Sequence, residues 1–259
     1  MKRIIALLMA MMMIFALTAC GGVDPAEDLE NVKDAGKLKI GYTIYEPMNY
    51  KEDGKLTGFD TEFAQAVCKK LGVEAEFVLI DWDNKLMELE SGNIDCIWNG
   101  MTITDEIKAG ADVSKAYAKN KQVVVMNAEK AKNIKSVDDL KGLTFAAEAG
   151  SAGEGAVKDN KLEKDFVPVN AQTDALLEVQ SNKVDACVID ITMAEAMTGE
   201  GTDYADLGIA LKLTDEEYGI AFRKGSNLTA EINKIIDELK KDGTLDKLSE
   251  KYPKVELAL

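Results

Sequence analysis

Apolar runs with the two-residue period of a β-strand alternate with stretches of helical period in the first part of the chain. Residues 58–72 show the helical pattern best, because apolar side chains recur there every four residues before a glycine stop. The other elements predicted in this part are strands over 37–43, 74–80 and 94–99 and a helix over 83–92. Strands that alternate with helices are typical of βαβ units, so we expect an α/β fold with mainly parallel sheets.

The same pattern returns further along the chain. It predicts a strand with a glycine turn over 142–150, a helix over 171–182 and a strand over 184–190. A weak internal echo links the two parts: in LESGNIDCIWN (89–99) and VQSNKVDACVI (179–189) a helix ends, a polar turn follows and an Asp opens a buried strand. Chance similarity of two βα units is the alternative, but the echo favours two lobes over one sheet.

Two continuous apolar strands, 120–127 and 216–225, flank the second part and are typical of crossings between lobes. Amphipathic helices close the chain and are expected to pack on the first lobe. The expected organisation is lobe 1 over 36–116 and 219–259, lobe 2 over 122–213, and a hinge formed by 117–121 and 214–218.

The N-terminus is predicted to be a secretory signal peptide over 1–19. Lys2 and Arg3 precede an apolar run that is too short for a comfortable membrane span of roughly 20 residues. The run ends in LTAC, which resembles a bacterial lipobox and implies diacylglyceryl transfer to Cys20; two acyl chains anchor a protein stably. A plain signal peptide with an incidental cysteine is the alternative. The chain from 20 to 35 is then expected to be a lipid-anchored tether.

Charge and composition exclude several classes of function. The net charge of −15 would repel phosphates, which argues against nucleic acid as a partner. The absence of histidine excludes Ser-His-Asp and Cys-His catalysis and every His-containing metal site. We expect no cofactor and no metal. Cys68, Cys96 and Cys187 each lie in an apolar run and are expected to be buried thiols, although one disulfide pair remains an alternative.

Five segments in register carry a resemblance to a known family: DGKLTGFDTEFAQAVCKKLGV (53–73), DWDNKLMELESGNIDCIWNGMTIT (81–104), SVDDLKGLTFAAEAGSAGEG (136–155), VDACVID (184–190) and YGIAFRKGS (218–226). Together they resemble the bacterial extracellular solute-binding proteins of family 3, which serve polar amino-acid ABC importers. The resemblance implies a hinged, two-lobed clamp of the periplasmic-binding-protein type II. The ligand is expected in the cleft, at strand ends and helix N-termini.

The resemblance implies an aromatic sandwich around the ligand in lobe 1. Tyr45 matches an aromatic residue that stacks on the ligand, and Trp82 matches its partner on the other side. Tyr42 lies where specificity for the ligand's side chain is often set. The alternative for Tyr45 and Trp82 is a place in the hydrophobic core.

The resemblance also assigns polar contacts on both sides of the cleft. Gly100 and Thr102, with Asn99 beside them, match backbone and hydroxyl contacts to the amino-acid head group. In lobe 2, Ser151 matches a hydroxyl residue whose amide faces the cleft, and Asp190 matches the carboxylate that receives the α-amino group. Local roles are the alternatives: a strand-end turn for Thr102 and helix N-caps for Ser151 and Asp190.

The sequence departs from the family at Ile107, where members ordinarily have an arginine that clamps the ligand's α-carboxylate. Lys108 is adjacent, but neighbouring helical positions point about 100° apart and lysine is not a bidentate fork. Glu148 lies where relatives often place a neutral or basic group near the ligand; a solvated surface glutamate is the alternative. An acidic, aromatic cleft without arginine suits a cation or amine. An amino acid held by Thr102, by backbone amides near Ser151 and by Lys108 is the alternative.

The function expected from these observations is that of a monomeric, lipid-anchored, extracytoplasmic substrate-binding protein, not an enzyme. It would capture an amino-acid-like or cationic amine solute and deliver it to an ABC permease. One rival is an enzyme on the same scaffold, similar to cyclohexadienyl dehydratase, with Glu148 as general acid. Another is a sensory binding protein.

Overall fold

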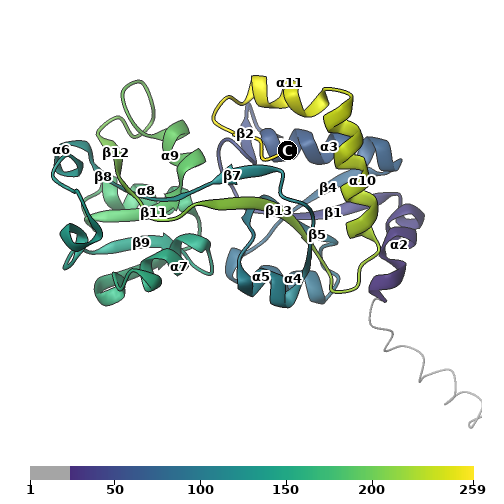
Figure 1. The fold of residues 1–259 in the computed structure, drawn as a ribbon, viewed down its shortest axis with the longest axis horizontal. Coiled ribbons are helices and arrows are strands. Elements are labelled where there is room, and N and C mark those ends of the chain that lie inside the picture. The colour runs from purple at the N-terminus through teal and green to yellow at the C-terminus, as the bar shows by residue number, and fades with distance from the viewer. Residues whose placement is uncertain (1–23) are drawn as a thin grey trace, which may run out of the picture.

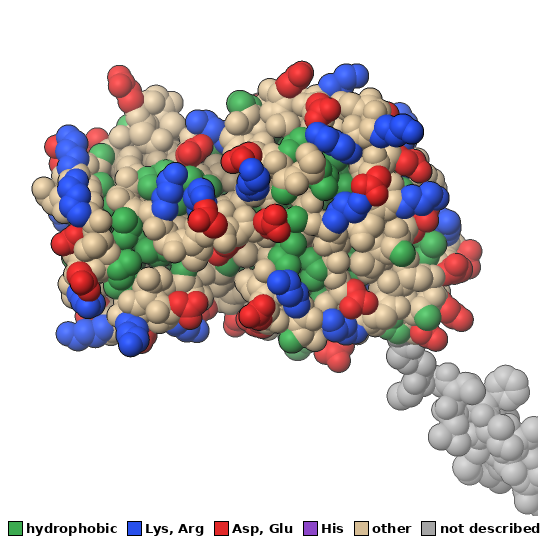
Figure 2. Space-filling model, viewed as in Figure 1, with side chains coloured by type: hydrophobic (Ala, Val, Ile, Leu, Met, Phe, Trp, Pro, Cys, Tyr) green, Lys and Arg blue, Asp and Glu red, His purple; other side chains and the backbone are tan. Residues whose placement is uncertain are grey.

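Two β-sheets covered by helices form two lobes side by side in the computed structural model, which describes residues 24–259 (Figure 1). This confirms the predicted two-lobed α/β fold. No helix among the described residues is both long and apolar enough to cross a bilayer. Acidic and basic side chains are interspersed over the face of both lobes seen in Figure 2, so this face carries no continuous basic patch.

The six-stranded sheet of lobe 1 has the order β4-β1-β5-β13-β6, with β7 also paired to β13. β1 pairs in parallel with β4 and β5, whereas β13 runs antiparallel to β5. The strands are β1 (Lys37–Tyr42), β4 (Glu74–Leu79), β5 (Cys96–Thr102), β6 (Asp112–Val113), β7 (Ala118–Asn120) and β13 (Glu216–Phe222), besides a hairpin of β2 (Tyr50–Glu52) and β3 (Lys55–Thr57). The helices are η1 (Pro25–Glu27), α2 (Asp28–Ala35), α3 (Phe59–Leu71), η2 (Trp82–Asn84), α4 (Lys85–Glu90), α5 (Asp105–Gly110), α10 (Leu228–Lys241) and α11 (Thr244–Lys251).

The five-stranded sheet of lobe 2 has the order β10-β9-β11-β8-β12. Its strands are β8 (Gln122–Asn127), β9 (Phe145–Glu148), β10 (Phe166–Val169), β11 (Ala186–Asp190) and β12 (Leu207–Lys212). Its helices are α6 (Ala128–Ala131), η3 (Val137–Leu140), α7 (Ala152–Asp159), η4 (Glu163–Asp165), α8 (Gln172–Gln180) and α9 (Ile191–Met197). The internal echo falls on β5 and β11, which hold the same place in their sheets, beside β1 and β9 respectively.

The chain passes between the lobes twice. β7 pairs with β13 in lobe 1, and β8 pairs with β12 in lobe 2, so the links are Lys121 and the residues 213–215. Both strand pairs continue across the junction in Figure 1. The links lie within or next to the hinge ranges expected from the sequence. Most of the residues assigned to the hinge are paired strand residues of lobe 1.

The core of lobe 1 forms where α3 packs against α10 and α11 and against the sheet. Phe63 of α3 meets Trp98 of β5 edge to face, with ring centroids 4.9 Å apart. The C-terminal helices therefore pack on lobe 1, as expected from their amphipathic pattern. Cys68, Cys96 and Cys187 are buried free thiols, which confirms the prediction made from their apolar surroundings.

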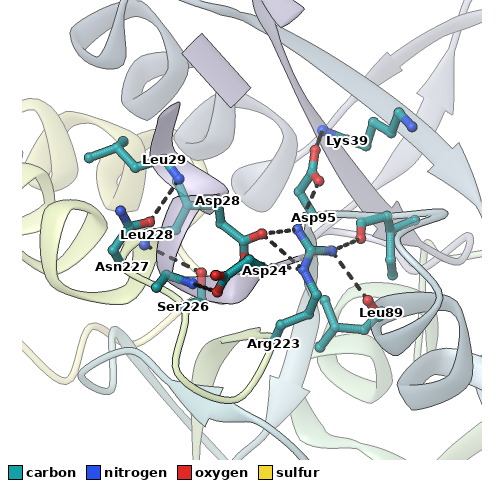
Figure 3. Close-up of polar contacts among 12 residues, drawn as sticks. Asp24, Asp28, Leu29, Lys39, Leu89, Asp95, Arg223, Ser226, Asn227 and Leu228 are labelled. Atoms are coloured by element: carbon teal, nitrogen blue, oxygen red, sulfur yellow. Dashed lines mark hydrogen bonds and ion pairs between the residues drawn. The ribbon is translucent and has the colours of Figure 1, made fainter. Parts of the chain in front are cut away.

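Part of the range expected to be a tether, 20–35, is folded, because Asp28–Ala35 form helix α2 at the end of lobe 1 farthest from lobe 2 (Figure 1). Asp28 is fully buried and accepts hydrogen bonds from Nε and Nη2 of Arg223, the latter at 2.7 Å. Figure 3 shows the Arg223 guanidinium between Asp28 and Asp95. Asn227 binds the same segment by accepting from the Leu29 amide at 2.8 Å. The polar pattern of this segment predicted a tether because it does not show contacts with residues almost 200 positions away.

Candidate functional site

A cavity of about 240 Å³ lies between the lobes and is walled by both. Lobe 1 contributes η2, α4, the end of β5 and the start of α5, and lobe 2 contributes the end of β9 with α7, α8 and β11. All but two of the predicted ligand-binding residues line it: Trp82, Asn99, Gly100, Thr102, Glu148, Ser151 and Asp190. The volume suits a small solute, since pockets for drug-sized ligands measure about 300–1,000 Å³.

Tyr42 and Tyr45 are not on the wall of this cavity. Tyr45 is buried in the core of lobe 1, and its Oη lies 2.5 Å from the Oη of Tyr218. Gly100, with φ of +54°, leaves room for this ring: a Cβ there would lie 2.5 Å from Cε1 of Tyr45. Tyr42 packs edge to face on Phe77, with ring centroids 5.9 Å apart. The structure therefore brings Trp82 to the cavity without the second aromatic face that the sequence led us to expect.

Asp190, at the end of β11, is the centre of a buried polar network. Its carboxylate accepts hydrogen bonds from Gln122 Nε2 at 2.8 Å and from the side-chain amides of Asn120 and Gln172. It stands at the N-cap of α9 but makes no side-chain cap bond, so the capping alternative does not describe it. Burial, followed by repulsion from Glu216, raises the pKa of Asp190 to about 7.

Glu148, at the end of β9, is 3% exposed, which rules out the solvated-surface alternative. Its Oε1 has no hydrogen-bond partner among the described residues. Burial and the nearby Asp190 raise the pKa of Glu148 to about 8, against an opposing effect of Lys85. A carboxyl group of this kind is stabilised in its charged form by any added cation.

Glu216 lines the cavity and links the two lobes through hydrogen bonds. Its Oε2 accepts from Thr102 Oγ1 at 3.0 Å, from Gln122 Nε2 at 3.0 Å and from Asn120 Nδ2 at 3.1 Å. Sequence reasoning missed Glu216, Asn120 and Gln122 because they lie in the strands interpreted as crossings between the lobes, where no ligand contact was sought. All three residues lie where the chain passes between the lobes. Glu216 therefore belongs both to the acidic lining of the cavity and to the hinge.

Ser151 caps a helix and also lines the cavity. Its Oγ accepts from the Glu154 amide at 3.2 Å and so caps α7, while the residue lines the cavity. Its amide donates to the carbonyl of Glu148 at 3.2 Å. Asn99 likewise uses its side chain within lobe 1, where Oδ1 accepts from Thr43 Oγ1 at 2.7 Å. The Ser151 amide, expected to face the ligand, already has a protein acceptor.

Ile107 and Lys85 share the lobe 1 wall of the cavity. Ile107 is 2% exposed and belongs to an apolar cluster with Trp82. Lys85, one helical turn after Trp82, was missed by the sequence analysis; it is 4% exposed and its Nζ lies 5.2 Å from the centroid of the Trp82 ring. Lys108 is not on this wall and lines a separate groove. Lys85 is the one basic side chain among the described residues that line the cavity.

The chemistry of the cavity is acidic, with one ammonium group. Its carboxylates are Glu106, Glu148, Asp159, Asp190 and Glu216. Within residues 24–259 no group of three or more His, Cys, Asp or Glu side chains is arranged to hold a metal ion. The arrangement can therefore bind a small solute by charge pairing and hydrogen bonds in the cavity between the lobes.

Comparison with known proteins gives the same architecture. The chain is 34% identical over 256 residues to the arginine-binding extracellular protein ArtP of Bacillus subtilis, covering 97% of this chain and 98% of ArtP. The structure superimposes on a mutant of ArgBP from T. maritima with a TM-score of 0.81 at 34% identity, over 87% of this chain and 98% of that one.

A further solved structure connects the scaffold with an enzyme. The ancestral amino acid-binding protein AncCDT-1, a precursor of cyclohexadienyl dehydratase, superimposes with a TM-score of 0.79 at 34% identity, over 86% of this chain and 98% of that one. The sequence profile of the bacterial extracellular solute-binding proteins, family 3, matches residues 38–255. On this match and these relatives, the chain belongs to the bacterial extracellular solute-binding proteins of family 3.

Proposed function

We propose that this protein is the substrate-binding component of an ABC importer and captures a small solute that carries a positively charged amine. Its family supports a role in solute binding outside the cytoplasm, and the arginine-binding relative supports an amine-bearing solute. Binding would close the two lobes around the solute without a covalent step. A permease would be the partner to which the closed, monomeric clamp delivers it.

The observation that carries the proposal is the pair of buried carboxyl groups, Glu148 and Asp190, on the same cavity wall. The pKa of each is raised because the group is buried near another acid. Neither carboxylate therefore has enough neighbouring positive charge to stabilise its ionised form. A cationic group between them would favour both charged forms. A solute without a cation would leave the carboxyl groups protonated or unpaired, which is costly in a buried site.

Membrane anchoring belongs to the same proposal. The signal peptide over 1–19 and the lipidated Cys20 lie outside the described residues. The anchor would place the clamp next to its permease, with α2 as the first α-helix of the described residues.

The enzyme alternative has one feature in its favour, since a carboxyl group with a raised pKa such as Glu148 can act as a general acid. The compared proteins are named as binding proteins, one of them a precursor of an enzyme. We therefore propose binding and transport.

Isothermal titration calorimetry tests the proposal. L-Arginine, L-lysine, agmatine and 1,4-diaminobutane would be titrated near pH 7 in two buffers that differ in ionisation enthalpy, with L-glutamate as an acidic comparison. We expect an amine to bind and to release protons, because its charge lowers the pKa of Glu148 and Asp190. The variant Asp190→Asn should bind at least about tenfold more weakly.

A matched control is Glu163→Gln, which removes an exposed carboxylate of the same lobe and should leave affinity unchanged. Preferential binding of L-glutamate, or amine binding that is identical in Asp190→Asn, would contradict the proposal.

A further inference from the structure

Lys85 is a buried ammonium group without a carboxylate partner. No carboxylate oxygen of residues 24–259 lies within the 4.0 Å of its Nζ that would define an ion pair. Its hydrogen bonds go to two carbonyl oxygens, that of Trp82 at 3.2 Å and that of Gly150 at 2.7 Å. An ammonium group has three N–H donors, so one donor of this cavity-lining side chain has no acceptor among the described residues.

The position of this group is tied to the cleft itself. Trp82 belongs to lobe 1 and Gly150 to lobe 2, so the Nζ of Lys85 bridges the lobes at the edge of the cavity. A ligand group bound to it would lie where the two lobes meet. Burial lowers the pKa of Lys85 against the longer-range attraction of Glu106, Glu148, Asp83 and Glu154. None of these carboxylates bonds to its Nζ, so an anion that joins the ammonium group completes its hydrogen bonding.

Two anion receptors expected from the family resemblance are not available in this cavity. Ile107, in the position where the family resemblance implies an arginine, presents an apolar side chain packed with Trp82. The amide of Ser151 is engaged by the Glu148 carbonyl. The positive charge missing at position 107 is therefore present on this wall at position 85, carried by α4 instead of α5.

We propose that Lys85 binds the carboxylate of the solute, while Asp190 and Glu148 bind its cationic groups. The inference rests on the proposed function and narrows its substrate class: the solute is an amino acid with both a carboxylate and an ammonium group, not a simple diamine. This favours the amino-acid alternative, with Lys85 in place of Lys108. The expectation of a solute without a bound carboxylate came from Ile107, from the acidic residues and from the expected aromatic pair.

The test compares amino acids with the amines that remain when the carboxylate is removed. Calorimetry would measure L-arginine against agmatine, L-lysine against 1,5-diaminopentane and L-glutamine against 4-aminobutanamide. In the pair that contains the true solute, the wild type should bind the amino acid about tenfold or more tightly than its decarboxylated amine. In Lys85→Met, which keeps the length of the stem but not the charge, the preference should fall to within about threefold.

Two further variants keep the test decisive. Lys158→Met removes an exposed lysine of α7 that pairs with Glu154, and it should keep the wild-type preference. Lys85→Arg keeps the charge and should retain a preference for the amino acid, and thermal unfolding of each variant shows that it is folded.

The outcomes separate this inference from the proposed function. Tight binding of the decarboxylated amines by the wild type, or an equal preference in wild type and Lys85→Met, overturns the role of Lys85 and leaves the proposed function standing. Binding confined to solutes without an amine, or no binding across all pairs, overturns both.

Discussion

Gly150 of lobe 2 and Asp83 of lobe 1 lie so close that a Cβ on Gly150 would come within 2.7 Å of Asp83 Oδ1 and 2.9 Å of Asp83 Cα. The second of these atoms belongs to the backbone of η2 and cannot rotate away. Gly150 also has φ of +67°, a conformation that side chains disfavour. Glycine at this position therefore serves the turn and the contact between the lobes.

We predict that Gly150→Ala weakens solute binding by about tenfold or more, because the added methyl group holds the lobes apart. The control is Gly142→Ala, whose φ of +85° carries the same conformational cost but whose Cβ meets nothing within 4 Å. Both variants should lose about 1 kcal/mol of stability, and only Gly150→Ala should lose affinity. Calorimetry and small-angle scattering with and without solute would measure this. Equal affinity in the two variants would contradict closure through Gly150.

The solute-free protein should lose stability as the pH rises from about 5 to about 8. Burial raises the pKa of Asp60 to about 7, that of Asp190 to about 7 and that of Glu148 to about 8, above the ordinary values of 3.8 for Asp and 4.5 for Glu. In this window the native state binds more protons than the unfolded state, so the free energy of unfolding falls with rising pH. Urea unfolding at several pH values would measure the slope.

Glu148→Gln is the matched variant for this slope, because it keeps the size of the side chain and removes its titration. Its stability should decline less steeply than that of the wild type between about pH 6 and 8. An unchanged slope would show that Glu148 does not titrate there.

Arg223→Met should destabilise the protein by about 3–5 kcal/mol, because Asp28 would remain buried without its partner. Arg223 also donates to the carbonyl oxygens of Leu89 at 3.2 Å and Ile94 at 2.7 Å, which would lose those donors. The control Lys132→Met removes an exposed pair with Glu129 and should change stability by less than about 1 kcal/mol. Urea unfolding of both variants would compare them, and similar small losses would contradict the docking of α2 through Arg223.

Tyr45 and Trp82 should respond differently to loss of their rings. Tyr45→Leu should cost about 2 kcal/mol or more of stability, because a buried ring and its bond to Tyr218 are lost. Solute affinity should change by less than about threefold. Trp82→Leu should weaken binding by about tenfold or more. The opposite result, with affinity lost in Tyr45→Leu while stability is kept, would return Tyr45 to the site.

Cys20→Ala tests the anchor. We predict an unlipidated protein that leaves the membrane fraction or keeps its signal peptide, because the acceptor thiol for the diacylglyceryl group is gone. Membrane fractionation with mass spectrometry of the N-terminus would measure this. Substitution of Ser151 by Ala serves as a control that should leave anchoring unchanged. Continued acylation of the Cys20→Ala protein would exclude the lipobox interpretation.

Local pattern was sufficient for the elements that build each lobe. The helix predicted over 58–72 is α3 (Phe59–Leu71), and its glycine stop, Gly72, has φ of +81° in the structure. The periodicity of apolar residues and a left-handed glycine act within a few residues, so the local sequence is enough to predict this helix and its end. The same holds for Asp190, which ends a predicted buried strand and therefore lies at the strand edge where the cavity forms. Glu148 ends the neighbouring strand β9, but the family resemblance and not the local pattern placed it near the ligand.

Tertiary contacts decided what the local pattern left open. Tyr45 has the chemistry to stack on a ligand or to fill a core, and its contact with Tyr218, 173 residues away in sequence, places it in the core. Helix α2 reads as a polar tether until Arg223 comes to its side from 195 residues away. The local pattern did not single out Lys85, whose Nζ meets the Gly150 carbonyl only because lobe 2 lies against η2 and α4. Burial and pairing depend on the distance between segments in space, which a local pattern of residues does not contain.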